Sequence, residues 1–145
     1  MNVNEFFKKV YTVAFRLTGD EIKAGDMAIN AIECSFSEFM LSDKVSSLML
    51  QKTAKEVCKL FISEAENNIR VFKRFEQNNS DAELLQDALM NLNPISRMII
   101  VWRDLLGFKI GDMAEIKYSK LELYSELNNA RRQMKDFLLD ISLYG

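Results

Sequence analysis

Apolar residues recur three and four positions apart along most of the chain, a spacing typical of amphipathic helices with one buried face. In the first half of the sequence this pattern predicts three helices. The apolar stripe of the first helix is formed by Phe6, Phe7, Val10, Tyr11, Ala14 and Phe15. The stripe of the second is formed by Ala24, Met27, Ala28, Ala31, Ile32, Ser35, Phe36 and Phe39. The third helix begins near Val45, and its stripe is formed by Leu50, Ala54, Val57, Cys58, Phe61, Ala65, Ile69 and Phe72.

The residues between these stripes predict where the helices end. Gly19 suits the left-handed residue that closes a helix, and Asp20 suits the N-cap of the next helix. Residues 41–43 predict a loop between the second and third helices.

A polar segment near the middle of the chain predicts a boundary. Residues 75–81 are mostly amides and acids, and they end with Ser80 or Asp81 as the N-cap of a new helix. Ser80 and Glu83 also have the spacing of a capping box. We therefore expect a three-helix module over residues 1–75, a linker over residues 76–81 and a second helical module over residues 82–145.

The second module begins with a helical pattern that Asn93-Pro94 interrupts, because proline disfavours helix in the residue before it and suits the first turn of a new helix. A helix over residues 95–105 and a short one over about residues 110–116 follow. After a turn at Tyr118-Ser119 comes the most regular stripe, formed by Leu123, Leu127, Ala130, Met134, Phe137 and Ile141. A short helix, a turn and a longer helix are the outline of a helix-turn-helix, although many small bundles share it.

The composition agrees with an all-α fold. Turn-rich β folds need many glycines and prolines, whereas this chain of 145 residues has 5 and 1. No apolar stretch approaches the roughly 20 residues of a membrane helix. The N-terminus lacks the charge order and cleavage site of a signal peptide, so we expect a cytoplasmic protein that does not contact membranes.

The reactive residues do not indicate catalysis. Histidine is absent, which removes the commonest general base and metal ligand. The chain also lacks a glycine-rich phosphate loop, a nucleophile elbow and a Cys-x-x-Cys pair. Cys34 and Cys58 lie at helix-like positions and are expected to pack in the core. We predict a protein that is not an enzyme and that uses no cofactor or metal.

Short motifs occur in a fixed order over nearly the whole chain. In the first module, Tyr-Thr-Val-Ala-Phe-Arg-Leu-Thr-Gly-Asp at residues 11–20 is followed by Ala-Gly-Asp-Met at residues 24–27 and Thr-Ala-Lys-Glu-Val-Cys at residues 53–58. In the second, residues 88–104 begin Ala-Leu-Met-Asn-Leu-Asn-Pro and continue through an arginine and an aliphatic run to an acid. Gly-Phe-Lys-Ile-Gly-Asp-Met-Ala-Glu-Ile and Leu-Asn-Asn-Ala-Arg-Arg-Gln-Met follow at residues 107–116 and 127–134. This ordered set resembles the bacterial sigma factors of the extracytoplasmic-function (ECF) type.

The resemblance implies a function in transcription initiation. The first module is similar to sigma region 2, which docks on core RNA polymerase and melts the −10 promoter element. The second is similar to sigma region 4, a helix-turn-helix of winged-helix-like type that reads the −35 element. The implied partners are core RNA polymerase and promoter DNA, together with an anti-sigma factor or a sigma-like partner subunit.

The same resemblance implies the residues of three contact sites. Polymerase is expected to contact Asp26, Met27 and Asn30. The −10 DNA is expected to contact Phe39, Lys44, Lys52 and Lys55. The −35 DNA is expected to contact Ser119, Lys120, Glu122, Tyr124, Ser125 and Arg131. Core packing is the expected role of the aromatic residues Phe6, Phe7, Phe15 and Trp102.

The chain departs from the family pattern at these contact sites. Ile29 and Asn30 stand where the family offers glutamine and glutamate to polymerase, and Glu56 replaces an asparagine. Two glutamates, Glu122 and Glu126, lie near positions where threonine and arginine are expected, and glutamate is repelled by phosphate.

The charge distribution leaves two functions open. Residues 79–145 carry 8 basic and 10 acidic side chains, whereas a DNA-binding module usually has a basic excess. The clustered basic residues Arg131, Arg132 and Lys135 are explained equally by phosphate contact or by a solvated helix face. The chain is therefore interpreted as a divergent sigma factor or as a sigma-like protein that acts through protein contacts with little DNA reading.

Overall fold

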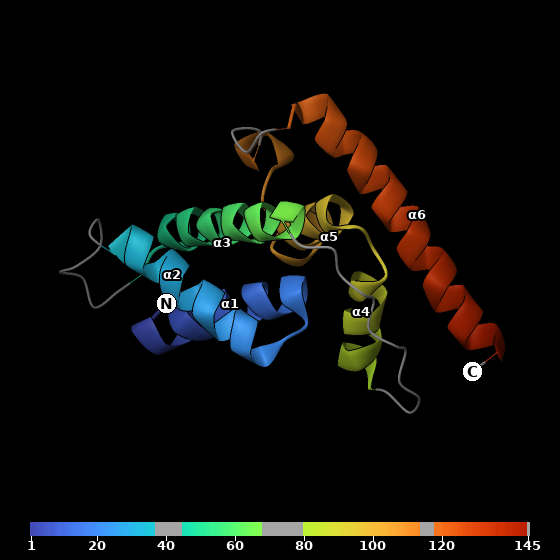
Figure 1. The fold of residues 1–145 in the computed structure, drawn as a ribbon, viewed down its shortest axis with the longest axis horizontal. Coiled ribbons are helices and arrows are strands. Elements are labelled where there is room, and N and C mark those ends of the chain that lie inside the picture. The colour runs from blue at the N-terminus through green and yellow to red at the C-terminus, as the bar shows by residue number, and fades with distance from the viewer. Residues whose placement is uncertain (37–44, 68–79, 114–117, 145) are drawn as a thin grey trace. The chain divides into compact units, whose positions relative to one another are not determined.

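The computed structural model describes residues 1–36, 45–67, 80–113 and 118–144 (Figure 1). The chain forms two compact units, Met1–Asn68 and Ile69–Gly145. Every regular element within the described ranges is helical, so the predicted all-α fold is confirmed. The predicted linker lies outside these ranges except for Ser80 and Asp81, and the limits of the two modules stay predictions.

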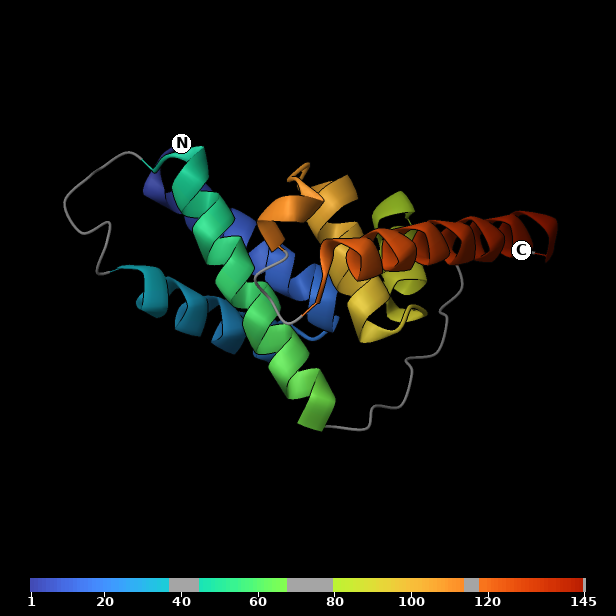
Figure 2. The ribbon, with the colours of Figure 1, turned by 90° about the horizontal axis from the view of Figure 1, so that it is seen from above.

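The described residues of the first unit, 1–36 and 45–67, form three helices, as predicted. Its helices are α1 (Val3–Thr18), α2 (Glu21–Phe36) and α3 (Ser47–Asn67), and each packs against the other two. Figure 2 shows α3, in green, crossing the pair formed by α1 and α2. The segments before α1 and α3 are also joined, because the Val45 N–H donates to the Met1 carbonyl at 2.9 Å and the Met1 amino group donates to the Val45 carbonyl at 3.2 Å.

The core of the first unit corrects the predicted face of α1. Val13 and Leu17, which the predicted stripe omits, are buried, whereas Phe7 and Tyr11 are exposed. The buried apolar side chains of α1 are Phe6, Val10, Val13, Ala14 and Leu17. The buried face is thus rotated from the predicted one, because pairs of adjacent apolar residues leave the stripe ambiguous by one position. The predicted stripe of α2 holds more closely, with Ala24, Met27, Ala28, Ala31 and Ser35 buried.

Within residues 80–113 and 118–144, the second unit contains three α-helices and two short irregular turns. They are α4 (Asp81–Met90), α5 (Pro94–Ile100), the π-helical turn η1 (Val101–Leu105), the 3-10 turn η2 (Ile110–Met113) and α6 (Lys120–Tyr144). Helix α6 packs against α4, α5 and η2. The predicted helix-turn-helix includes residues 114–117, which lie outside the described ranges, so its turn geometry stays a prediction.

Side-chain caps set the starts of α4 and α5 where the sequence predicts them. Ser80 Oγ accepts a hydrogen bond from the Glu83 N–H at 3.3 Å, and Asn93 Oδ1 accepts one from the Ser96 N–H at 2.9 Å. Pro94 is the first residue of α5, where its missing N–H costs no helical hydrogen bond. Both breaks in the helical pattern therefore correspond to real helix boundaries.

Arg97 is a buried charge that closes the end of α4. Its Nε donates to the Leu89 carbonyl at 2.8 Å, and its Nη2 donates to the carbonyls of Met90 and Leu92 at 3.4 Å and 2.9 Å. The last carbonyls of a helix have no partner within the helix and carry its negative dipole end. The guanidinium therefore satisfies these carbonyls and joins α5 to α4.

The helix predicted over residues 95–105 is not uniform. It becomes a π-helical turn at η1, after which Gly107 has a left-handed φ of 76°. Trp102 is fully buried, and its Nε1 donates to the Lys109 carbonyl at 2.8 Å. Phe108 packs against the same indole at a ring-centroid distance of 4.8 Å. The indole thus holds the chain where it turns back after α5, and core packing is its role as expected.

Burial along α6 ends before the predicted stripe does. Leu123, Leu127 and Ala130 are buried, whereas Met134 and Phe137 are only half-buried. The first half of α6 is therefore the part that anchors this helix in the second unit.

Candidate partner-binding and nucleic-acid interface

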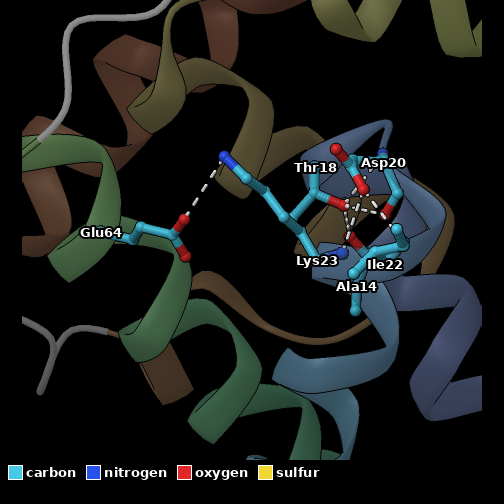
Figure 3. A network of polar contacts seen from close by, with 6 residues as sticks. All are labelled: Ala14, Thr18, Asp20, Ile22, Lys23 and Glu64. Carbon is cyan, nitrogen blue, oxygen red and sulfur yellow. Dashed lines mark hydrogen bonds and ion pairs between the residues drawn. The ribbon is translucent and has the colours of Figure 1, made fainter.

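A network of polar contacts forms the corner between α1 and α2 (Figure 3), which precedes the predicted polymerase site on α2. Gly19 closes α1 with a φ of 66°, and Thr18 Oγ1 donates to a carbonyl one turn earlier at 2.9 Å. Asp20 Oδ1 then accepts from two N–H groups in the first turn of α2, at 2.9 Å and 3.0 Å. Lys23 on α2 forms a 3.7 Å ion pair with Glu64 on α3. The predicted roles of Gly19 and Asp20 are confirmed, and the Leu-Thr-Gly-Asp motif acts as a helix corner.

The three predicted polymerase contacts lie in different environments on α2. Asp26 and Asn30 are exposed and one turn apart, so both are available to a partner. Met27 is 5% exposed and lies in the core of the first unit. Met27 lies between Asp26 and Asn30 in the sequence but not on their face of the helix. The prediction that Met27 contacts polymerase is therefore corrected.

Two apolar residues that the predicted site omits lie on the exposed side of α2. Ile22 is 78% exposed and Ile29 is 56% exposed. Both lie off the predicted apolar stripe of this helix, and that offset is the sequence signal that would have found them. Ile29 was noted as a departure from the family pattern, whereas Ile22 was missed.

The predicted −10 site is only partly described. Lys52 is exposed and Lys55 is half-buried on α3, whereas Phe39 and Lys44 lie outside the described residues. Glu56, which stands where the family pattern has an asparagine, accepts a hydrogen bond from Lys59 Nζ at 3.3 Å. Its carboxylate is therefore balanced by a neighbour on the same helix.

The first turn of α6 is stabilised by two residues of the predicted −35 site. Ser119 Oγ accepts from the Glu122 N–H at 3.1 Å, and Glu122 Oε1 accepts from the Ser119 N–H at 3.4 Å. This reciprocal pair is a capping box. Its Ser-x-x-Glu spacing was readable in the sequence, and both residues have a structural role at the helix start.

Two further charged residues of α6 are bound within the second unit. Glu126 Oε2 accepts from the buried Ser96 hydroxyl at 2.9 Å, which joins α6 to α5. Arg131 donates from Nε and Nη2 to the two carboxylate oxygens of Asp104, at 2.9 Å and 2.6 Å. The hydrogen bonds and charge of Arg131 lower the pKa of Asp104, and Asp104 raises the pKa of Arg131. In this arrangement, Arg131 is already neutralised by an acid.

The remaining side chains at the start of α6 form its exposed side. Lys120 and Ser125 are exposed, and Tyr124 is 46% exposed. Leu121 is 81% exposed and was missed by the sequence prediction. This side of the helix offers one ammonium group, two hydroxyls and one apolar side chain, a set that suits base edges and thymine methyl groups as well as a protein surface.

The described residues contain no group of three or more His, Cys, Asp or Glu side chains placed to hold a metal ion. Cys34 is exposed, which corrects its expected core position, whereas Cys58 is buried and its burial raises the pKa of the thiol to about 12. Among the helices of the described ranges, none is long and apolar enough to cross a membrane.

The fold is similar to that of a solved structure. One chain of the co-crystal structure of the sigma factor RpoE in complex with the anti-sigma factor NepR from Bartonella quintana matches with a TM-score of 0.65. The match covers 94% of this chain and 93% of that chain at 16% sequence identity. Neither a protein-family model nor a curated protein matches the sequence. The likeness therefore concerns the fold, and it extends over both helical units.

Proposed function

We propose that the protein is a divergent sigma factor that binds core RNA polymerase and directs it to promoters. The observation that carries this proposal is the extent of the fold likeness. It covers 94% of this chain and 93% of one chain of a sigma and anti-sigma complex, so it includes both units. The ordered motifs that resemble sigma regions 2 and 4 support the same conclusion independently.

In this proposal, the first unit docks on the polymerase through Asp26 and Asn30 on α2, which are exposed and adjacent. Phe39, Lys44, Lys52 and Lys55 contact the −10 DNA strand, as the resemblance implies. An anti-sigma factor is a further expected partner, because the similar solved chain belongs to such a complex.

The second unit reads the −35 element with α6. Lys120, Tyr124 and Ser125 are exposed near the start of this helix, the part that contacts base edges in helix-turn-helix proteins. Glu122 and Glu126 accept hydrogen bonds from other residues of the second unit, so both acids stabilise the fold. Their presence is therefore weaker evidence that DNA contacts have been lost. Ser119 supports the reading helix as its N-cap.

A sigma-like protein that acts through protein contacts is the second candidate. The pairing of Arg131 with Asp104 favours it, because it removes a cation from the residues available to phosphate. Phosphate contacts supply most of the non-specific affinity of DNA-binding proteins, and the second unit has no excess of basic residues.

Binding to core RNA polymerase purified from the source organism, followed by transcription from a promoter library, separates the two candidates. A divergent sigma factor binds the polymerase and selects a −35/−10 pair from the library. A protein that binds the polymerase and initiates at no promoter supports the second candidate. A chain that does not bind the polymerase contradicts the primary proposal.

Glu122→Gln sharpens this experiment, because glutamine retains the capping geometry while it removes one negative charge. If α6 contacts DNA, the variant should form the promoter complex more tightly than the wild type at equal helix stability.

A further inference from the structure

An acid from another element reaches the cluster of basic side chains on α6. Arg131, Arg132 and Lys135 are exposed, and Arg131 and Lys135 lie one turn apart on the same side of the helix. Asp104 in η1 lies 27 residues earlier in the chain and pairs with Arg131. A cluster of cations attracts phosphate, so this acid removes part of that attraction.

The geometry of this pair is one with which arginine also binds phosphate. Arg131 Nε donates to Asp104 Oδ2 at 2.9 Å, and Arg131 Nη2 donates to Asp104 Oδ1 at 2.6 Å. Arginine binds carboxylate and phosphate groups alike through two parallel N–H···O hydrogen bonds. The carboxylate of Asp104 therefore occupies donors that a DNA phosphate would need.

A π-helical turn places Asp104 beside α6. The Leu106 N–H donates to the Val101 carbonyl, five residues earlier, at 2.9 Å, so η1 departs from α-helical spacing. Single π-helical turns occur frequently at functional sites. Trp102 in the same turn is fully buried and anchors this segment in the core. Asp104 is therefore held beside Arg131 by a packed element.

The pair can open, because both partners are partly exposed. The Arg131 side chain is 49% exposed and the Asp104 side chain is 32% exposed. Exposed ion pairs contribute little to stability, since solvent screens their attraction. A phosphate gains the Arg131 donors only in the fraction of chains in which the pair is open, and its apparent affinity falls by that fraction.

From these observations we propose that the pair of Asp104 and Arg131 is an autoinhibitory contact that limits binding of the second unit to DNA. In the free chain Asp104 occupies the donors of Arg131, so Arg131 makes no phosphate contact. This inference rests on the proposed function, because it concerns the DNA contacts of the second unit. It adds a residue outside α6 that sets the strength of those contacts.

Asp104→Asn tests the autoinhibitory contact in the full-length chain, with a fluorescein-labelled DNA duplex of arbitrary sequence as the probe. The variant removes the charge that competes with phosphate and releases Arg131. The affinity at low salt should rise by about fivefold, the effect of an exposed ion pair at the upper end of its usual strength. The slope of the logarithm of the association constant against the logarithm of the salt concentration should steepen by about 0.9, the contribution of one added phosphate contact. Fluorescence anisotropy over a salt series measures both quantities.

Asp136→Asn is the matched control, because it removes the same charge from an exposed position on α6 that is not on the Arg131 side of the helix. This control should leave the salt slope unchanged. The double variant Asp104→Asn/Arg131→Gln has the net charge of the wild type, and in it the gain should disappear. A gain that persists without Arg131, or an equal change of slope in the control, overturns the proposal.

This test is separate from the polymerase experiment, because the chain binds the duplex alone. A chain that selects promoters with polymerase but shows no gain in Asp104→Asn overturns the autoinhibitory contact and leaves the proposed function intact. A chain that shows the gain but does not bind polymerase contradicts the proposed function and supports the contact. Absence of DNA binding by Asp104→Asn at every salt concentration overturns the contact. A change in polymerase binding alone also overturns it, because the pair would then serve a protein interface.

Discussion

On α2, the side chains that depart from the sigma pattern face solvent, whereas on α6 they are held by other residues of the same unit. Ile29 is exposed beside Asp26 on α2. On α6, Glu122 caps the helix and Glu126 binds the buried Ser96. Two sets of unusual residues therefore have different physical explanations: the first set is available to a partner, and the second stabilises the unit that contains it.

Measurements of the free energy of unfolding and of partner binding can test this difference. Substitutions of exposed residues of α2, such as Ile29, should change the binding of a protein partner and leave the stability of the fold unchanged. Substitutions at the internal polar contacts of the second unit should lower the stability of that unit. A loss of stability from the α2 substitutions, or unchanged stability after substitution of the internal contacts, would contradict this difference.

Arg97→Met should have the largest effect. It removes the guanidinium from three carbonyls near the end of α4 and should lower the free energy of unfolding by about 3 kcal/mol, because hydrogen bonds to charged groups are strong when buried. Urea unfolding followed by circular dichroism measures the change. Arg103→Met, at an exposed arginine, should stay within about 0.5 kcal/mol of the wild type. Equal effects of the two variants would contradict a special role for Arg97.

Ser96→Ala should destabilise the second unit by about 1.5 kcal/mol, because it removes a charge-assisted hydrogen bond between α5 and α6. Ser125→Ala provides the control at an exposed serine on α6. Urea midpoints of the two variants are compared at pH 7. If Ser96→Ala is as stable as its control, the hydrogen bond between Ser96 and Glu126 does not stabilise the second unit.

Ser119→Ala should cost about 1 kcal/mol through the lost N-cap of α6. Glu122→Gln should be nearly neutral, since the amide oxygen still accepts from the Ser119 N–H. Thermal unfolding of both variants checks the pair. A large loss in Glu122→Gln would mean that its negative charge, rather than the capping geometry, stabilises the helix start.

Asp104→Asn should have the smallest effect, about 0.5 kcal/mol at pH 7, because both partners of the pair with Arg131 are substantially exposed. The pKa of Asp104 is lowered in the folded chain, so its contribution is complete above the ordinary aspartate pKa of 3.8 and is lost as pH falls through the folded-state pKa. The difference from wild type should therefore shrink in unfolding measurements at pH 3. Equal stability of Asp104→Asn and the wild type at pH 7 would contradict a stabilising role for this ion pair.

Sequence reasoning predicted the local features whose causes are local. The helical class, the corner at Gly19-Asp20, the cap at Ser80 and the helix break at Pro94 follow from spacing and from the local backbone preferences of single residues. The capping box at Ser119 belongs to the same class and was readable, although it was interpreted as a DNA contact.

Tertiary structure alone decided which side of a helix is buried and which charges are paired. The buried face of α1 depends on the packing of three helices, which a stripe with adjacent apolar residues leaves ambiguous. The pair of Asp104 with Arg131 joins residues 27 positions apart, and the hydrogen bond of Ser96 to Glu126 spans 30. Contacts at such separations exist only after the elements have packed, because no periodicity within one helix encodes them.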